Sequence, residues 1–168
     1  MKKIFAIVAL MTCLSVATQS YGQLAVDKGT KFLNVGIGVG GSYYGYSGGI
    51  GIGGSFEVGV AKNITVGAVG AYRGYEFASD YRLGARGSYH FNELLNLSEE
   101  KIDLYAGVGL IYSGWTWKES FVGVRDSYGG IDFGGHVGGR YFFKPALGAF
   151  AEAGFGIAPL QLGLTFKF

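Results

Sequence analysis

The chain has 168 residues, which suits one domain, and it is rich in glycine and aromatic residues, with 32 Gly, 13 Phe and 12 Tyr against 2 Pro. Its 14 basic residues fall to 12 when Lys2 and Lys3 are removed with the leader predicted below, and 12 acidic residues balance them. This balance argues against nucleic-acid binding, which needs clustered basic residues, and the regular placement of glycine argues against disorder.

The first element, residues 1–22, is predicted to be a secretory signal peptide. Lys2 and Lys3 precede a short apolar run, and small residues precede the expected cut. The apolar run is too short for a membrane-spanning helix, which needs about 20 residues. Cys13 lies inside this run, so the mature chain, residues 23–168, is expected to contain no cysteine and to need no disulfide.

Eight β-strands are predicted in the mature chain, because apolar residues recur at every second position. No segment after the leader holds 18 consecutive apolar residues, so we expect no helical membrane span. Each predicted strand has about the 9–11 residues that a tilted transmembrane strand needs, and bacterial barrels have an even number of strands. The predicted ranges are 30–40, 49–61, 63–74, 79–91, 100–113, 128–143, 146–157 and 160–168.

The two faces of these strands differ in kind: one is apolar and uncharged, whereas the other carries glycine and scattered charges. In the last strand the apolar face consists of Leu160, Leu162, Leu164, Phe166 and Phe168. The apolar faces of other strands include Val35, Ile52, Val66, Leu83, Val108, Phe133 and Ile157. Glycine suits the narrow interior of an eight-stranded barrel, whereas on a water-facing strand it only weakens the sheet. We therefore predict an all-β fold, an eight-stranded antiparallel up-and-down transmembrane β-barrel.

The connections between the predicted strands alternate in length. Short turns are expected near 61–63 and 144–146, and the connection 113–126 is long. In bacterial barrels short turns face the periplasm and long loops face the outside. Two connections depart from this pattern, because 92–99 is long and the last connection, at Pro159, is short.

The inward face carries too many charged residues for a narrow interior to bury them as unpaired charges. An unpaired buried charge is costly, so we expect Arg–carboxylate pairs and trapped water to fill the lumen, the space inside the barrel. The predicted lumen network consists of Glu57, Arg82, Arg86, Asp103, Asp132, His136, Arg140 and Glu152. The alternative is a narrow porin-like channel for small ions or solutes, which the filled interior of eight strands disfavours.

No catalytic or metal-binding motif is evident. His90 and His136 lack the HxH or HExxH spacing of metal sites. Ser88 and the carboxylates are residue types that hydrolases use, but the sequence defines no geometry for them. The glycine-rich runs lie within predicted strands, without a following helix to hold phosphate. We therefore predict no enzyme activity, no cofactor and no metal site.

The third long connection, 113–128, is the candidate for surface interaction. It carries Trp115, Trp117 and Phe121 among charged residues. These aromatic side chains are typical of an anchor at the membrane surface. The alternative is an exposed strand edge that pairs with a surface ligand.

The chain resembles the small outer-membrane β-barrels of the OmpX and OmpA-barrel kind over nearly all of residues 28–168. The segments that carry the resemblance are 82–91 (RLGARGSYHF), 104–112 (LYAGVGLIY) and the terminal strand that ends in Phe166 and Phe168. The resemblance implies a multi-pass protein of the Gram-negative outer membrane. It also implies that Leu164, Phe166 and Phe168 form the signal read by the barrel-assembly machinery. No catalytic motif comes with it.

These patterns predict a monomeric protein of the mature range 23–168, embedded in outer-membrane lipid. Its polar, side-chain-filled lumen would serve envelope structure, or its extracellular loops would bind a surface partner. A third class, a soluble ligand-binding barrel, predicts solubility without detergent.

Overall fold

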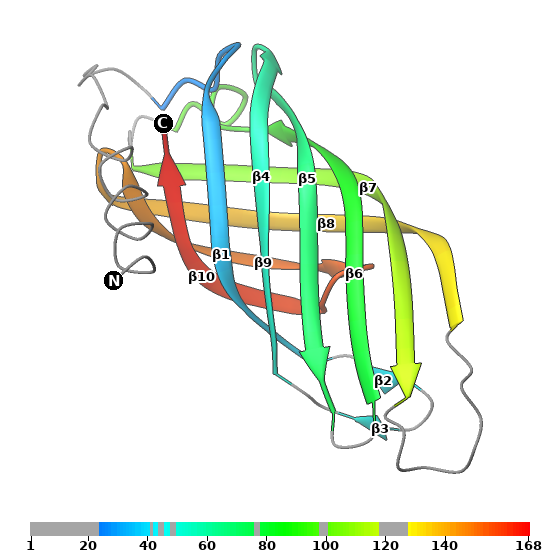
Figure 1. Ribbon diagram of the computed structural model, residues 1–168. Helices are drawn as coiled ribbons and strands as arrows, with labels where there is room; N and C mark the ends of the chain where they lie inside the picture. The colour runs from blue at the N-terminus through cyan, green and yellow to red at the C-terminus, as the bar shows by residue number, and fades with distance from the viewer. Residues whose placement is uncertain are drawn as a thin grey trace, which may run out of the picture.

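A computed structural model describes residues 24–40, 42–43, 46–47, 50–75, 78–97, 101–117 and 128–168. Within these residues, eight long strands form a closed antiparallel barrel (Figure 1). The strands are β1 (Lys31–Val39), β4 (Gly51–Ala61), β5 (Ile64–Gly74), β6 (Ala78–His90), β7 (Ile102–Trp117), β8 (Tyr128–Lys144), β9 (Leu147–Phe155) and β10 (Leu160–Lys167). Two short strands, β2 (Ser42–Tyr43) and β3 (Tyr46–Ser47), form a separate pair.

Each barrel strand pairs with its neighbours along the chain, and β1 pairs with β10 to close the barrel. The register at the closure places Val35 opposite Leu164 and Ile37 opposite Leu162. The terminal strand thus has β9 on one side and β1 on the other, so its backbone is held on both edges. This topology confirms the predicted all-β, up-and-down barrel.

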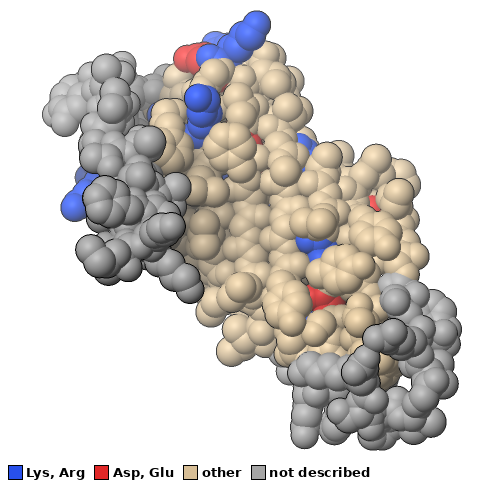
Figure 2. All heavy atoms as spheres, in the orientation of Figure 1, with Lys and Arg blue, Asp and Glu red and all other residues tan. Residues whose placement is uncertain are grey.

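The barrel wall has an apolar outer face and a buried inner face. Outward side chains are largely exposed, for example Ile52 of β4 at 65%, Leu83 of β6 at 61% and Val108 of β7 at 71%. Inward side chains such as Glu57 and Asp103 are fully buried. Figure 2 shows one side of the wall as mostly uncharged, with basic side chains gathered at one end.

The outward assignment of Ile157 is wrong. Ile157 is only 9% exposed and packs inside the barrel against Ile111 and Val69. The cause is Gly156, whose φ of 97° lies in the left-handed region that glycine adopts without strain. The strand alternation therefore ends at Phe155, and the chain turns into the lumen.

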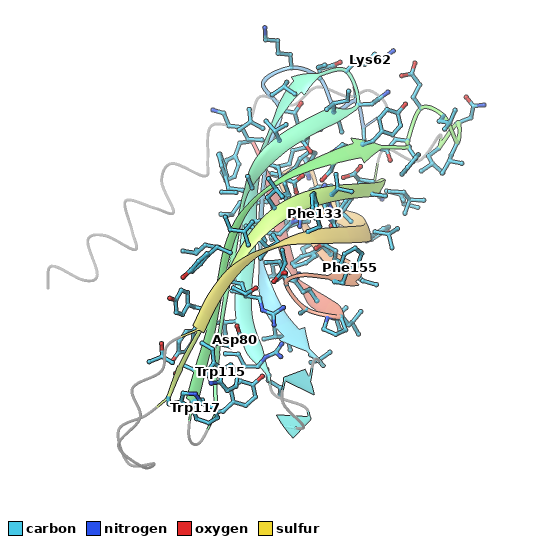
Figure 3. The ribbon with its side chains drawn as sticks, turned by 90° about the vertical axis from the view of Figure 1, so that its right-hand side faces the viewer. Lys62, Asp80, Trp115, Trp117, Phe133 and Phe155 are labelled. Atoms are coloured by element: carbon cyan, nitrogen blue, oxygen red, sulfur yellow. The ribbon has the colours of Figure 1, made fainter. Side chains whose placement is uncertain are left out.

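The two ends of the barrel differ. One end, here called the turn end, carries the turns at 62–63 and 145–146 and the carboxyl terminus (Figure 1). At the other end, the loop end, β5 and β7 end and β6 and β8 begin (Figure 1). Figure 3 shows Lys62 at the turn end and Asp80, Trp115 and Trp117 at the loop end. In the part of the chain that the structure describes, no helix is long and apolar enough to cross a membrane.

Strand β7 is longer than predicted, because it continues past Ser113 to Trp117. Its last residues pair with β6, where Trp117 lies opposite Ala78, and with β8, where Trp115 lies opposite Tyr128. The strands β6, β7 and β8 thus extend as one sheet at the loop end.

Candidate functional site

The centre of the lumen is occupied by an ion-pair network between side chains of five different strands. Arg86 of β6 lies between two carboxylates: its Nη1 and Nη2 donate to the two oxygens of Glu152, at 2.9 and 2.8 Å. Its Nη2 also donates to Glu57 Oε1 at 2.9 Å. This geometry is the bidentate pairing that suits a guanidinium and a carboxylate.

Arg140 of β8 is the second cation of this network and is 2% exposed. Its Nη1 donates to Asp103 Oδ2 at 2.6 Å, and its Nη2 donates to Glu57 Oε1 at 3.0 Å. The guanidinium lies 4.1 Å from the ring centre of Tyr105 and 4.4 Å from that of Phe32. Arg140 thus gains hydrogen bonds in its plane and cation–π contacts on its faces.

Neutral side chains complete the hydrogen bonding of the three buried carboxylates. Thr65 and Ser88 each donate to Glu57 Oε2 at 2.8 Å. Further donors are Tyr105 and Gln161 to Glu152, and Asn92 to Asp103. Each carboxylate accepts hydrogen bonds from cations and from neutral donors. These bonds offset the free-energy cost of removing the three charges from water.

Both histidines contact this network, and both rings lie near the ring of Tyr105. His90 Nδ1 is 2.7 Å from Asp103 Oδ1, and its Nε2 is 3.1 Å from the Thr65 hydroxyl. His136 Nε2 is 2.9 Å from Ser88 Oγ. Ser88 is only 3% exposed and donates its proton to a carboxylate, so this Ser–His contact is closed to a substrate.

Two of the predicted network residues lie elsewhere. Arg82 forms an ion pair with Asp80 at 3.1 Å and donates to the carbonyl oxygen of Gly156 at 2.6 Å. Asp132 is exposed at the loop end and contacts none of the central arginines. Both residues line the cavity at the loop end and lie too far along their strands to reach the central network.

The turn end of the lumen is closed by a segment that the sequence interpretation missed. Leu24 and Val26, which precede β1, are 6% and 1% exposed and pack against Phe32 and Phe142. The segment is held by a hydrogen bond from the Asn63 amide to the Val26 carbonyl, at 2.8 Å. The only sequence signal for it is an apolar pair beside the predicted leader.

An apolar layer lies between the ion-pair network and the loop end. It consists of Val69, Ile111, Ile157 and Ala158. Two cavities border this layer, with volumes of about 10 and 20 Å³. A single water needs a cavity of about 10–15 Å³, so each of them has room for about one water molecule.

A much larger cavity, of about 530 Å³, opens at the loop end. Its charged lining residues are Asp80, Arg82 and Asp132. Trp115 forms part of its wall and packs edge-to-face on Trp117 with ring centres 5.6 Å apart.

The residues of the predicted assembly signal lie on β10 and at the carboxyl terminus. Leu164 and Phe168 are 48% and 42% exposed on the outer wall, and Phe166 is half-buried. Phe121 lies outside the described residues. Among the residues that are described, no three His, Cys, Asp or Glu side chains gather as a metal site would require.

The fold is that of solved small outer-membrane β-barrels. The N-terminal β-barrel domain of OprF from Pseudomonas aeruginosa is similar, with a TM-score of 0.60 and 16% identity over 88% of this chain and 99% of that chain. Neisserial surface protein A has a TM-score of 0.60 and 15% identity, over 83% of this chain and 96% of that one. Ail of Yersinia pestis, solved in complex with the heparin analogue sucrose octasulfate, has a TM-score of 0.57 and 16% identity, over 84% and 99%.

At these identities the likeness concerns the fold, and it confirms the predicted resemblance to small eight-stranded outer-membrane barrels. No protein-family model and no curated protein matches the sequence.

Proposed function

We propose that the protein is a monomeric, integral component of the Gram-negative outer membrane, with its turn end in the periplasm and its loop end outside the cell. The observation that carries the proposal is the apolar outer face of the closed barrel, on which Ile52, Leu83 and Val108 are each more than 60% exposed. In water such a continuous apolar wall would drive aggregation, whereas in lipid it is the favourable surface. Barrel closure also pairs β1 with β10, so that the last strand has no open edge that would need water.

Biogenesis follows from the same proposal. Residues 1–22 act as the export signal, and residues 23–168 form the barrel domain. The terminal strand, with Leu164, Phe166 and Phe168 on one face, is the segment that the barrel-assembly machinery recognises. Its position as the closing strand, paired with β1, supports this role.

The lumen, in this proposal, is a structural filling without catalytic activity. Glu57 and Arg86 belong to a network of mutually paired charges, and each of the two cavities beside the apolar layer has room for only about one water molecule. The protein then contributes to the envelope through its rigid wall, and through its loops where they meet a surface partner.

Conductance of the refolded full chain in planar bilayers tests the filled lumen. We expect the recorded current to show no discrete channel openings. Reproducible openings that disappear in Arg86→Gln would overturn this account and establish the narrow channel as the function. The protein with Lys62→Gln is the matched control, because Lys62 lies at an exposed turn outside the lumen.

Cell fractionation separates the membrane protein from a soluble ligand-binding barrel. We expect the chain in the outer-membrane fraction, with a gel mobility that changes on heating as the barrel unfolds. Recovery of the folded chain from the periplasm or medium without detergent would contradict the proposal.

A further inference from the structure

The basic residues of the described chain are divided by type between the lumen and the turn end. Arg86 and Arg140 form ion pairs inside the lumen. The described lysines instead lie at the turn end, where β4, β6, β8 and β10 end and the strands that follow them begin. These lysines are Lys28, Lys31, Lys62, Lys101, Lys144 and Lys167.

Two of these lysines, Lys31 and Lys144, lie on the outer face of the barrel wall and are exposed. Lys144, at the end of β8, is opposite Leu147 of β9, and Leu147 is opposite Phe166 of β10. Phe168, two residues beyond Phe166, exchanges backbone hydrogen bonds of 3.0 and 3.2 Å with Lys31 of β1. Residues opposite each other share one face of a sheet, and Phe168 is 42% exposed on the outer wall. These five residues form one outward surface, here called the turn-end patch.

The two lysines of the turn-end patch lie on either side of its apolar residues. Lys144 ends β8 and Lys31 begins β1, and β9 and β10 lie between these two strands in the barrel. Figure 1 shows β1 and β10 side by side at the carboxyl terminus. Neighbouring strands are about 4.7–4.9 Å apart, so three such steps separate the two lysines by about 14 Å along the wall. Each ammonium group can therefore bind an anion of its own, with apolar side chains between the two anions.

Neither lysine of the turn-end patch is neutralised by the rest of the described chain. Among the described residues, no ion pair involves Lys31 or Lys144. Glu93, a carboxylate of the same end, is already engaged by Lys62 at 2.7 Å. The two positive charges of the patch are thus available to anions outside the protein.

The turn-end patch lies at the level of lipid headgroups when the wall is in a membrane. Outward aromatic side chains at strand ends mark the membrane interface in outer-membrane barrels. At this end they include Phe143 and Phe168, at 51% and 42% exposed, which lie directly beside Lys144 and Lys31. A lysine stem covers apolar surface while its ammonium group reaches the headgroups. The patch therefore suits a lipid, whose acyl chains contact the wall while its phosphates meet the lysines.

Two other partners fit the turn-end patch less well. A two-fold dimer through this patch would bring together two surfaces of the same positive charge. A soluble polyanion would contact the ammonium groups but would leave Phe166 and Phe168 without an apolar partner. A lipid that carries two phosphates satisfies both the charges and the apolar side chains between them.

We propose that the turn-end patch binds a glycerophospholipid with two phosphate groups, of the cardiolipin class, with one phosphate at Lys31, the other at Lys144 and acyl chains along Leu147 and Phe166. This inference rests on the proposed function, because it requires that the outer wall lie in lipid and that the turn end meet the periplasmic leaflet. It makes the turn end a lipid-selective surface of the barrel.

The test measures the lipids retained by the full mature chain, residues 23–168, refolded in detergent micelles. Native mass spectrometry counts the lipid molecules bound after addition of cardiolipin, phosphatidylglycerol or phosphatidylethanolamine. We expect cardiolipin to bind about fivefold more tightly than phosphatidylglycerol at the same phosphate concentration, because only cardiolipin engages both lysines with one molecule. Lys31→Gln and Lys144→Gln are each expected to weaken cardiolipin binding about fivefold, the effect of one lysine beside anionic lipid.

Lys62→Gln is the matched control, because it removes a lysine of the same end whose charge is already engaged by Glu93. Its cardiolipin binding is expected to equal that of the unchanged protein. Heat-modifiable gel mobility establishes that each variant is folded, and all three variants keep Phe166 and Phe168. An equal loss in Lys62→Gln would show general charge attraction and overturn the proposal. Equal binding of cardiolipin and phosphatidylglycerol would also overturn it.

Peptidoglycan, an anionic polymer of the periplasm, is the competing partner for the two lysines. Sedimentation of the barrel with purified peptidoglycan is expected to be the same for Lys31→Gln, Lys144→Gln and the unchanged protein. Sedimentation that is lost in both variants, together with no preference for cardiolipin, would assign the patch to the cell wall and overturn the proposal.

Two further measurements separate this proposal from the one on which it rests. Flotation with phospholipid vesicles tests membrane insertion, and labelling of Lys62→Cys on intact cells with a cell-impermeant maleimide tests orientation. A barrel that floats and is not labelled, but binds cardiolipin no better than phosphatidylglycerol, would overturn the lipid proposal alone. Failure to float, or labelling of Lys62→Cys on intact cells, would instead contradict the proposed membrane location or orientation.

Discussion

Arg140 shows how one buried side chain stabilises two buried carboxylates of the lumen. The guanidinium donates to Asp103 and Glu57 and lies between the rings of Phe32 and Tyr105. Removing one partner of a buried ion pair costs about 3–5 kcal/mol, because the other charge is left uncompensated. A lysine would supply a point charge without the planar fork, so it would not reproduce these contacts.

Gly138 lies against the ring of Tyr105, where we expect a larger residue not to fit. In Gly138→Ala the new Cβ would lie 2.7 Å from Tyr105 Cζ and 2.9 Å from the carbonyl oxygen of Ala151. The ring that packs on Arg140 would then have to move, and we expect the free energy of unfolding to fall by about 1–3 kcal/mol. Urea unfolding of the refolded barrel in micelles, followed by tryptophan fluorescence, measures this change.

Gly130→Ala is the control for this prediction, because an added Cβ would meet no atom within 4 Å. We expect its stability to match that of the unchanged protein. If both glycine variants lost the same stability, the cause would be the backbone preference of glycine rather than the packing of Tyr105.

Among the structural elements, the segment that precedes β1 has the clearest unexpected role. Leu24 and Val26 close the turn end of the lumen against Phe32 and Phe142. Phe32 in turn stacks on His90 with ring centres 5.6 Å apart, so this apolar cluster covers the charged network on the side of the turn end.

Leu24→Ala is expected to lower the free energy of unfolding by about 2 kcal/mol or more, since a buried leucine is truncated in a site that cannot fully collapse. Urea unfolding in micelles provides the measurement. Leu94→Ala is the matched control, because Leu94 is 68% exposed in the turn after β6 and should change stability little. A loss of similar size in both variants would contradict the closing role of the segment.

The molecule as a whole presents an apolar outer wall, and the depth of each residue in the membrane decides the cost of a charge there. Val108 lies in the middle of β7 and is 71% exposed, whereas Val60 lies beside the turn that ends β4. Arginine on the lipid face costs about 2–4 kcal/mol at the midplane and about 0–1 kcal/mol near the interface.

We therefore expect Val108→Arg to destabilise the barrel in phospholipid vesicles by about 2–4 kcal/mol, and Val60→Arg to change it by less than about 1 kcal/mol. Reversible unfolding by guanidinium in vesicles measures both. Two small and equal effects would show that this wall does not face hydrocarbon.

Alternation along the chain was sufficient to predict the strands and the outer wall. In β10 the residues Leu160, Leu162 and Leu164 lie on the exposed face, as their spacing of two predicts. The prediction failed where the backbone left the strand conformation, because the positive φ of Gly156 reverses the side of the sheet on which Ile157 falls. Nothing in the local pattern signals that change.

The lumen could be predicted only in part, because a period of two tells on which face a residue lies but not how far along the barrel axis. Glu57, Arg86 and Glu152 meet at one level, whereas Arg82 and Asp132 lie nearer the loop end. The level depends on the register between strands, which is set by the turns and by the closure of the barrel.

The sequence by itself determined the all-β class, the number of strands and the division between an apolar and a polar face, since each depends on local periodicity and composition. Only the tertiary structure decided which charges pair, what closes the turn end of the lumen, and that the pairing of β8 with β9 begins only at Gly135. These features depend on the relative lengths and registers of strands that are distant in the chain, and such relations arise only when the barrel closes.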